Sequence, residues 1–410
     1  APSSSLYLTI DRDLQGYAQD AIQGFSGAAV VIERNTGRVL AIASSPGFNP
    51  NFFEPNNKNN QALPALLNDY QQPLVNRATQ GQYPLGSVFK VITFSAALSS
   101  GLYTADTTYE CGYHFIELPD RVLNDWTYEH CQDEIRYSYA NDPENALDIN
   151  TCYTQPSGDL TLSESLMRSC NPYYWHIGLD LYSSDRASDI ADMARAFGLG
   201  SATGLGQVAE AEGLIENPSD AVAAVNQAIG QGTMLVTPLQ VAVFMSALGN
   251  GGTLYRPQLI EKIQPLTGSP VSIFKPEALS TLPLSPEYLQ ILQDSMISVI
   301  EDRRGTANFR LRGYNIPTAA KTGTAESGDG LPHAWFAGYT MAEENTGLPD
   351  IAIAVILENA GEGSDYAAPA FRRIAEAYYF GSPQALYWYE SNYGVTQTPT
   401  PLGGIPTQKP

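Results

Sequence analysis

The fold is decided by one apolar segment, Tyr83-Pro84-Leu85-Gly86-Ser87-Val88-Phe89-Lys90-Val91-Ile92-Thr93-Phe94-Ser95-Ala96-Ala97-Leu98. Pro84 and Gly86 precede a helical pattern and Gly101 lies just past its end, so we predict a helix that begins at Ser87. Because apolar residues cover most of its circumference, this helix is expected in a core rather than on a surface. Ser87 and Lys90, three residues apart at its N-terminal end, then share one face.

The apolar neighbours of Lys90 should partly desolvate its amine, which favours the neutral form. A neutral amine within reach of the Ser87 hydroxyl would give a nucleophile with its own base. The spacing alone is weak support, because Ser-x-x-Lys arises by chance about once or twice in a chain of this length. A second copy, Ser272-Ile273-Phe274-Lys275, is followed directly by Pro276, which disfavours a helical Lys275, so its two side chains need not share a face.

The amino-acid composition limits the number of domains and the classes of partner that this chain can have. The 410 residues could form two or three average domains or one large α/β domain with subdomains, and an apolar content of 43% supports an extensive core. The formal net charge of −21 argues against nucleic acid and against an anionic membrane surface as partners. The sequence has no apolar run of about 18 residues, so we expect no membrane span. Residues Ala1–Ser5 have the features of neither a signal peptide nor an anchor, so we expect that such parts were removed or that this chain is a fragment.

The four cysteines are Cys111, Cys131, Cys152 and Cys170. They show neither CxxC nor Cys/His zinc spacing, so we expect no metal site and no cofactor. One disulfide in an oxidising compartment is compatible with this number of cysteines but is not required by it.

Strand patterns lie near both ends of the chain. Gly27–Glu33 and Arg38–Ala43 are apolar runs joined by Asn35-Thr36-Gly37, which is a hairpin signal. Three later strands are predicted at Thr318–Ala325, Ala334–Thr340 and Ile351–Leu357. We therefore predict an α+β fold, in which one antiparallel sheet built from both chain ends is flanked by helices, and the helices of the middle form a second lobe. Further predicted elements are a strand at Leu6–Ile10 and helices from Asp11 to Ile22 and at Ser184–Phe197, Ser219–Ile229, Pro238–Leu248, Pro286–Glu301 and Ala367–Tyr379.

Residues 104–159, called the acidic segment below, differ in composition from the rest of the chain. They contain 12 acids and two bases, are rich in tyrosine and have no clear period, so we predict an inserted, surface-exposed lobe. Beyond about Asn392, Thr, Pro and Gly repeat, which predicts a disordered tail over 391–410. The remaining 1–390 would form one domain.

Ser169-Cys170-Asn171 interrupts a helical pattern that runs from Leu160 to Leu181, and Pro172 makes a bend there. A bend can turn two polar side chains into a cleft. The alternative is a local capping turn, which three residues alone would favour.

Lys321-Thr322-Gly323-Thr324 lies in a predicted strand, where Lys321 and Gly323 share a face because side chains alternate. A glycine there lets another backbone approach closely, and Lys321 places a positive charge beside it. The alternative is a strand-end turn.

Together and in this order, Ser-x-x-Lys, Ser-x-Asn and Lys-Thr-Gly resemble the penicillin-recognising serine enzymes. The flanking sequences are similar to the transpeptidase domain of penicillin-binding proteins, of the monofunctional (class B) division and elongation type, over roughly residues 6 to 380. The similar flanks include Leu8-Thr9-Ile10-Asp11, Gly27–Val31, Ala228-Ile229-Gly230-Gln231-Gly232, Thr237-Pro238-Leu239-Gln240, Asn250-Gly251-Gly252 and Ala334–Tyr339. The resemblance implies a β-lactamase/transpeptidase-like fold. Class B enzymes also carry an N-terminal anchor and a pedestal domain, which are absent from these 410 residues.

The resemblance implies a serine D-Ala-D-Ala transpeptidase or carboxypeptidase. Ser87 would attack the carbonyl of a stem peptide while Lys90 takes its proton. Ser169 would relay that proton to the leaving D-alanine, and Asn171 would bind the substrate amide and orient Lys90.

The resemblance assigns the Lys-Thr-Gly strand to substrate binding. Lys321 and Thr322 would hold the terminal carboxylate beside Gly323, and the backbone N–H groups of Ser87 and Thr324 would form the oxyanion hole. The implied partners are peptidoglycan stem peptides, β-lactam antibiotics and membrane proteins of cell-wall synthesis or division. The implied location is the extracytoplasmic face of the cell membrane.

Three alternatives remain open. A class A β-lactamase needs a glutamate that activates a deacylating water, and Glu210, Glu212 and Glu216 lie in about the right region without that family's local pattern. A β-lactam sensor domain would carry the same motifs. A catalytically inactive cell-wall scaffold would bind a partner through the acidic segment, but the three motifs are intact.

In some relatives two cysteines bracket the segment between the first two motifs, and Cys111 and Cys152 match them. The resemblance therefore implies a Cys111–Cys152 disulfide, with Cys131 left over; the alternatives pair Cys131 with Cys111 or Cys152. Cys170 is expected to be a reduced, buried thiol, because a bridge there should displace Ser169 and Asn171.

Overall fold

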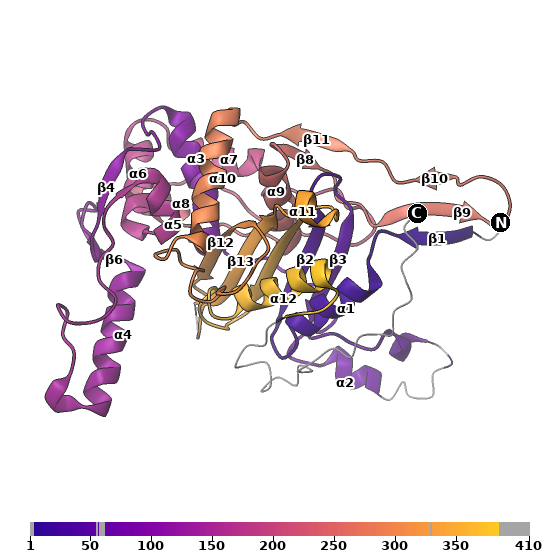
Figure 1. Ribbon diagram of the computed structural model, residues 1–410, viewed down its shortest axis with the longest axis horizontal. Coiled ribbons are helices and arrows are strands. Elements are labelled where there is room, and N and C mark those ends of the chain that lie inside the picture. Colours follow the sequence, from indigo (N-terminus) through magenta and orange to yellow (C-terminus); the bar gives the residue numbers. More distant parts are fainter. Residues whose placement is uncertain (1–3, 55, 57–61, 329, 385–410) are drawn as a thin grey trace.

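Five antiparallel strands from both ends of the chain form the central sheet (Figure 1). This computed structural model describes residues 4–54, 56, 62–328 and 330–384. The strand order is β12-β13-β14-β2-β3. The strands are β12 (Thr318–Ala325), β13 (His333–Thr340), β14 (Ile351–Leu357), β2 (Gly27–Glu33) and β3 (Val39–Ser45). The predicted α+β fold, with a sheet built from both chain ends, is therefore confirmed.

Both faces of this sheet are covered, which explains why its central strands are continuous apolar runs rather than alternating ones. The helices α1 (Arg12–Ala21) and α12 (Ala367–Phe380) pack on one face, in front of the sheet in Figure 1. The helices α9 (Pro238–Gly249) and α3 (Lys90–Ser100) belong to the core on the other face. Every residue of β14 is buried.

Local signals decide where the helices begin. Asp11 caps α1 by accepting hydrogen bonds from the backbone N–H groups of Asp13 and Leu14. Thr237 and Gln240 form a reciprocal capping box at the start of α9.

The remaining helices on the α3 side are α5 (Leu162–Arg168), α6 (Asn171–Ser183), α7 (Asp189–Ala196), α8 (Ala221–Ala228) and α10 (Pro286–Glu301).

The helix predicted to begin at Ser87 is instead two elements. Gly86–Phe89 form the 3₁₀ turn η3, and the α-helix α3 begins at Lys90. Such turns are frequent at helix N-termini. Here Gly86 has a positive φ of 57°, which tightens the entry of the chain into the helix.

An arm that includes the N-terminal strand extends from the molecule on the right of Figure 1. It consists of β1 (Ser4–Leu8), β9 (Ile260–Pro265) and β10 (Ser272–Ile273), paired antiparallel. The first predicted strand therefore lies slightly earlier than expected. The second Ser-x-x-Lys copy begins in β10 rather than in a helix, as its following proline indicated. The pair β8 (Thr253–Tyr255) and β11 (Ala278–Thr281) was not predicted.

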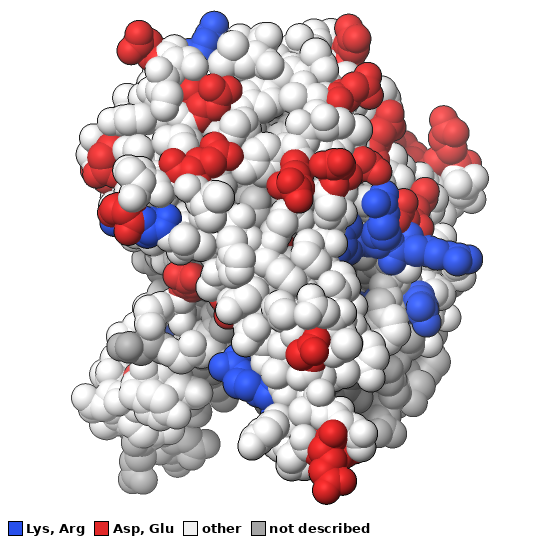
Figure 2. Space-filling view, turned by 90° about the vertical axis from the view of Figure 1, so that its left-hand side faces the viewer, with Lys and Arg blue, Asp and Glu red and all other residues white. Residues whose placement is uncertain are grey.

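The acidic segment projects on the left of Figure 1. It contains β4 (Thr108–Cys111), β5 (His114–Phe115), β6 (Leu123–Asn124), α4 (Trp126–Asn141) and the start of β7 (Gly158–Thr161). Its base is buried, since Phe115 and Leu118 pack with Trp175 of α6 and Val225 of α8. On this side of the molecule the acidic side chains are spread over the surface (Figure 2). The predicted tail 391–410 lies outside the described residues.

The disulfide expectation is wrong. Cys111 pairs with Cys170, with Cα atoms 6.2 Å apart, and Cys131 pairs with Cys152, with Cα atoms 5.4 Å apart. Cys170 is not inside a helix but is the N-cap of α6, at the break after α5, where it faces the end of β4. Cys152 lies beyond α4, opposite Cys131.

No helix in the described ranges combines the length and the apolar character needed to cross a bilayer.

Replacing Ile353 in β14 tests whether the sheet is the stability core. Ile353 is fully buried, so Ile353→Ala should lower the free energy of unfolding by about 2–5 kcal/mol through lost burial and a cavity. The matched control Ile273→Ala, in the exposed β10, should change it by less than about 0.5 kcal/mol. Urea unfolding measures both, and equal losses would contradict this assignment of the core.

Candidate active site

The turn that carries Ser87 is fixed by backbone contacts to distant segments. Gly86 N donates to Gly230 O at 2.9 Å, and Trp335 Nε1 of β13 donates to Pro84 O at 3.0 Å. Side chains three residues apart eclipse in a 3₁₀ turn, a geometry that favours Ser87 and the following Lys90 on one side. Ser87 is partly exposed, whereas Lys90 is fully buried.

Glycines let this turn pack directly on β12. A Cβ on Gly86 would lie 2.5 Å from Thr324 O, and a Cβ on Gly323 would lie 2.9 Å from Val88 Cγ2. Both separations are too short for a real side chain, and a Cβ on Gly323 would also lie 3.0 Å from Leu85 O, so the backbones of the turn and the strand approach each other closely. This is the close approach that the glycine of Lys-Thr-Gly predicted.

Lys90 joins the first motif to the second. Its Nζ donates to Ser169 O at 2.6 Å and to Asn171 Oδ1 at 2.5 Å, and it lies 3.3 Å from Ser169 Oγ. Burial lowers the pKa of Lys90 to about 7, against a smaller opposing effect of the Asp125 carboxylate. A lysine in this state supplies a substantial neutral fraction near neutral pH, as a general base requires.

The break between α5 and α6 presents the Ser-x-Asn groups. Ser169 ends α5 in the left-handed conformation, with φ 55°, which non-glycine residues seldom adopt. Asn171 then starts α6, with Pro172 in its first turn. The bend turns the carbonyl of Ser169 and the amide of Asn171 toward the same amine, which a simple capping turn would not require.

The third motif lies in β12, at the edge of the sheet. Lys321 is fully buried, and its Nζ donates to Thr322 O at 3.1 Å. Burial, and next the charge of Lys90, lower the pKa of Lys321 well below its usual value. A bound carboxylate would reverse this effect by stabilising the ammonium form. An edge strand also keeps one row of backbone groups that the sheet does not use.

Two residues near this strand were missed by the sequence analysis. Thr324 Oγ1 donates to Glu362 Oε2 at 2.7 Å, and His130 Nε2 of α4 lies 3.9 Å from Glu362 Oε1. Glu362 raises the pKa of His130. Gly363 packs on β12, since its Cβ would lie 2.2 Å from Gly323 O. The sequence signal for Glu362 was its place between two glycines, shortly after the apolar run Ile351–Leu357.

A third missed residue is Asp125, the N-cap of α4. It is fully buried, and its Oδ1 accepts a hydrogen bond from Asn171 N at 2.9 Å. Its position before a helical segment signals a cap, but nothing in the sequence indicates the contact with Asn171.

The three glutamates considered for a β-lactamase have other contacts. The Glu210 carboxylate accepts hydrogen bonds from Thr203 N and Thr203 Oγ1 at 2.8 and 2.6 Å, within its own loop. The backbone carbonyls of Glu212 and Glu216 accept from the side chains of Gln240 and Gln227.

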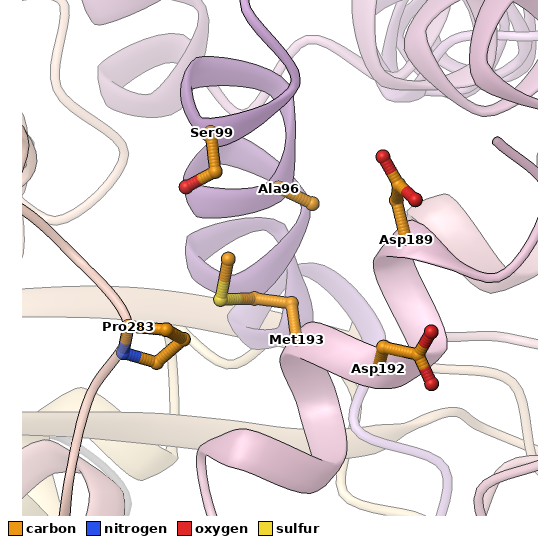
Figure 3. Close-up of a pocket in the computed structure, with 6 residues that line it drawn as sticks. All are labelled: Ala96, Ser99, Asp189, Asp192, Met193 and Pro283. Atoms are coloured by element: carbon orange, nitrogen blue, oxygen red, sulfur yellow. The ribbon is translucent and has the colours of Figure 1, made fainter.

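A separate pocket of about 210 Å³ lies between α3 and α7 (Figure 3). Met193 of α7 reaches toward α3 and Pro283 there. Ala96, Ser99, Asp189 and Asp192 complete the lining. It contains no residue of the three motifs. Among the described residues, no group of three or more His, Cys, Asp or Glu side chains is arranged to hold a metal ion.

The profile of the penicillin binding protein transpeptidase domain matches residues 27–141 and 137–376. The chain belongs to this family. The predicted family is therefore confirmed.

Relatives of this family extend along most of the chain. Peptidoglycan D,D-transpeptidase PbpA of Mycolicibacterium smegmatis is 31% identical over 387 residues, which cover 90% of this chain and 71% of that protein. Peptidoglycan D,D-transpeptidase MrdA of Acinetobacter baumannii is 28% identical over 401 residues, or 90% of this chain and 53% of that protein. The chain therefore spans about half the length of the MrdA relative.

The fold is also similar to a solved structure. Penicillin-binding protein A from M. tuberculosis, as a penicillin G acyl-enzyme complex, superposes with a TM-score of 0.75 at 28% identity, over 92% of this chain and 81% of that chain.

The two disulfides should differ in their effect on the site. The pair Cys111→Ser and Cys170→Ser frees the Ser-x-Asn turn from β4, so the rate of acylation by a penicillin should fall at least about tenfold. The matched pair Cys131→Ser and Cys152→Ser frees the segment after α4 from that helix and leaves the Ser-x-Asn turn tied to β4, so the rate should change by less than about threefold.

The rate is measured with a fluorescent penicillin, and thermal unfolding is measured alongside. On the chain-entropy estimate, the two bridges stabilise by roughly 4 and 3 kcal/mol, so a stability loss alone would be similar for both. Equal acylation by both double variants would contradict the assigned role of the Cys111–Cys170 bridge.

Proposed function

We propose that this chain is a serine D,D-transpeptidase that cross-links peptidoglycan stem peptides through an acyl-enzyme on Ser87. The observation that carries the proposal is the buried amine of Lys90, one turn after Ser87 and hydrogen-bonded to both Ser169 and Asn171. The partly exposed Ser87 hydroxyl precedes by one turn an amine with a pKa of about 7, which suits a nucleophile and its base.

In the first half-reaction, Ser87 Oγ attacks the carbonyl carbon of the penultimate D-alanine. The new C–O bond replaces the peptide C–N bond, and the proton of Ser87 passes to Lys90. Ser169, whose hydroxyl lies 3.3 Å from Lys90 Nζ, then relays a proton to the leaving D-alanine amine. Asn171 holds the substrate amide and keeps Lys90 oriented.

The edge strand β12 binds the donor peptide. A peptide that lies along an edge strand pairs with its unused backbone groups. Lys321 and Thr322 bind the terminal carboxylate, which compensates the buried ammonium. The N–H groups of Ser87 and Thr324 stabilise the oxyanion, because the glycine contacts hold the turn directly against the strand.

In the second half-reaction, the amine of a neighbouring stem peptide attacks the acyl carbon. Its proton passes to Lys90, and Ser87 Oγ leaves and regains a proton, so the enzyme returns to its first state. A β-lactam imitates the donor peptide, and opening of its ring leaves an acyl group on Ser87.

A β-lactamase would release that acyl group quickly through a water activated by a glutamate. Glu210 instead holds Thr203 in its own loop, so we propose that the adduct is long-lived. Intact-protein mass spectrometry after drug removal separates the two functions: loss of the adduct within seconds, with turnover of drug, would favour a β-lactamase.

We further propose that the protein acts on the extracytoplasmic side of the membrane with other proteins of cell-wall synthesis. Two disulfides are compatible with an oxidising compartment and would be rare in a reducing one. An inactive scaffold would not need the contacts of Lys90.

Ser87→Ala should abolish covalent labelling by a fluorescent penicillin, because no other hydroxyl occupies the position of Ser87. The matched control Ser272→Ala changes the other Ser-x-x-Lys copy, which lies in the exposed β10, and should label like wild type. Peptide mapping locates the label. Label on Ser272, or on the Ser87→Ala protein, would contradict the assignment of Ser87 as the nucleophile.

The acylation rate should rise with pH through an apparent pKa of about 7 and then level off. The sign follows because the neutral amine of Lys90 is the base, and its fraction increases as the pH passes its pKa. The measurement is the second-order rate constant for a penicillin between about pH 5 and 9, with the fold checked by circular dichroism at each end. A rate that is flat or falling through this range would contradict the role of Lys90.

A further inference from the structure

The acidic segment contributes a buried carboxylate to the catalytic site. Asp125 is fully buried, although it belongs to a segment whose other acids are mostly exposed. Its Oδ2 accepts hydrogen bonds from Thr127 Oγ1 at 2.6 Å and from Thr127 N at 3.2 Å. Its Oδ1 accepts from Asn171 N at 2.9 Å. One carboxylate therefore accepts hydrogen bonds at the N-termini of two helices, which are its own α4 and the α6 that starts with Asn171.

This contact matters because the first N–H groups of a helix have no partner inside that helix. Without Asp125, the N–H group of Asn171 would lose its hydrogen-bond acceptor. The N-terminal ends of both helices also favour a negative charge. Asn171 is itself one of the acceptors of Lys90 Nζ, so a shift of the start of α6 would move a ligand of the catalytic amine.

The charge of Asp125 acts on the same amine. Lys90 of α3 and Arg168 of α5 are cationic groups that interact with it, and Lys90 in turn interacts with Lys321. Burial raises the pKa of Asp125, while the hydrogen bonds from Thr127 and Asn171 and the charge of Lys90 favour its ionised form. In the ionised form, Asp125 favours protonation of Lys90 and so opposes the effect of burial on that lysine.

We propose that Asp125 is a positioning residue for acylation, which holds the backbone of Asn171 and through Asn171 orients the amine of Lys90. The inference rests on the proposed function of Ser87 and Lys90. It gives the base of the acidic segment a role in catalysis, whereas a purely structural role would confine Asp125 to capping α4.

The test compares Asp125→Asn, Asp125→Ala and Thr127→Val with the control Asp133→Asn. Asp125→Asn keeps an acceptor oxygen but removes the charge, and Asp125→Ala removes both. Thr127→Val removes one hydrogen bond of the α4 cap and leaves the contact with Asn171. Asp133 is an exposed acid on the same helix, paired with Arg136.

The readouts are the non-covalent dissociation constant, the acylation rate constant of a penicillin as a function of pH, and the melting temperature. Asp125→Asn should move the acid limb of the rate profile to lower pH by about one unit, since removing a negative charge disfavours protonation of Lys90. Asp125→Ala should in addition lower the limiting rate constant at least about tenfold, with the dissociation constant changed by less than about threefold. Thr127→Val and Asp133→Asn should keep the wild-type profile.

A folded Asp125→Ala protein that keeps the wild-type limiting rate constant would overturn the inference. So would a Thr127→Val profile equal to that of Asp125→Ala, because the cap of α4 would then account for the effect. If Asp125→Ala does not fold, Asp125→Asn decides, because its single amide oxygen cannot accept from both Asn171 and Thr127. A limiting rate constant and an acid limb that both equal those of the wild type would then overturn the inference. Either failure leaves label on Ser87, whereas a wild-type protein that no penicillin labels would refute the proposed function itself.

Discussion

The buried amine of Lys90 is the interaction on which the site depends. A charged lysine at full burial costs several kcal/mol unless it is paired, so the neutral form and hydrogen-bond acceptors around Nζ must offset that cost. These acceptors come from Ser169 and Asn171, 79 and 81 positions later in the chain. The amine is therefore stable in place only when α3 and the α5–α6 break are packed together. The proposed role of Lys90 as the base therefore requires correct packing of the helical half.

The other side of the site, formed by the turn of Ser87 and β12, depends on a different constraint, which is the absence of side chains at its glycines. Gly86, Gly323 and Gly363 each stand where a Cβ would lie within 3.0 Å of another atom, and Gly230 meets the carbonyl of Gly86 in the same way. Backbone thus packs on backbone from the turn of Ser87 through β12 to the loop after β14. This arrangement holds the N–H groups of the turn and the strand at a fixed separation without flexible side chains between them, which suits a site that must stabilise a developing charge.

Features that local sequence decides were predictable, and features that depend on distant neighbours were not. The strands of the sheet, the cap at Asp11 and the capping box at Thr237 follow from side-chain type and spacing along the chain. The predicted cysteine pairing was wrong because disulfide pairing depends on which ends of helices and strands meet in space. Cys170 occupies a helix break that faces β4, and not the interior of an apolar helix. Asp125 escaped notice for the same reason, since its partner Asn171 lies 46 positions away.

One helix of the acidic segment, α4, contacts both sides of the site, at the Ser-x-Asn turn and at the Glu362 that binds Thr324. At the start of α4, Asp125 contacts the N–H group of Asn171, and one turn later His130 faces Glu362, which accepts a hydrogen bond from Thr324. The Cys111–Cys170 bridge fixes the base of the segment to the same Ser-x-Asn turn. The acidic side chains on that side of the molecule are spread over its surface rather than gathered in one place (Figure 2). Because α4 contacts opposite sides of one site, a displacement of this helix would alter the surroundings of Asn171 and Thr324 together.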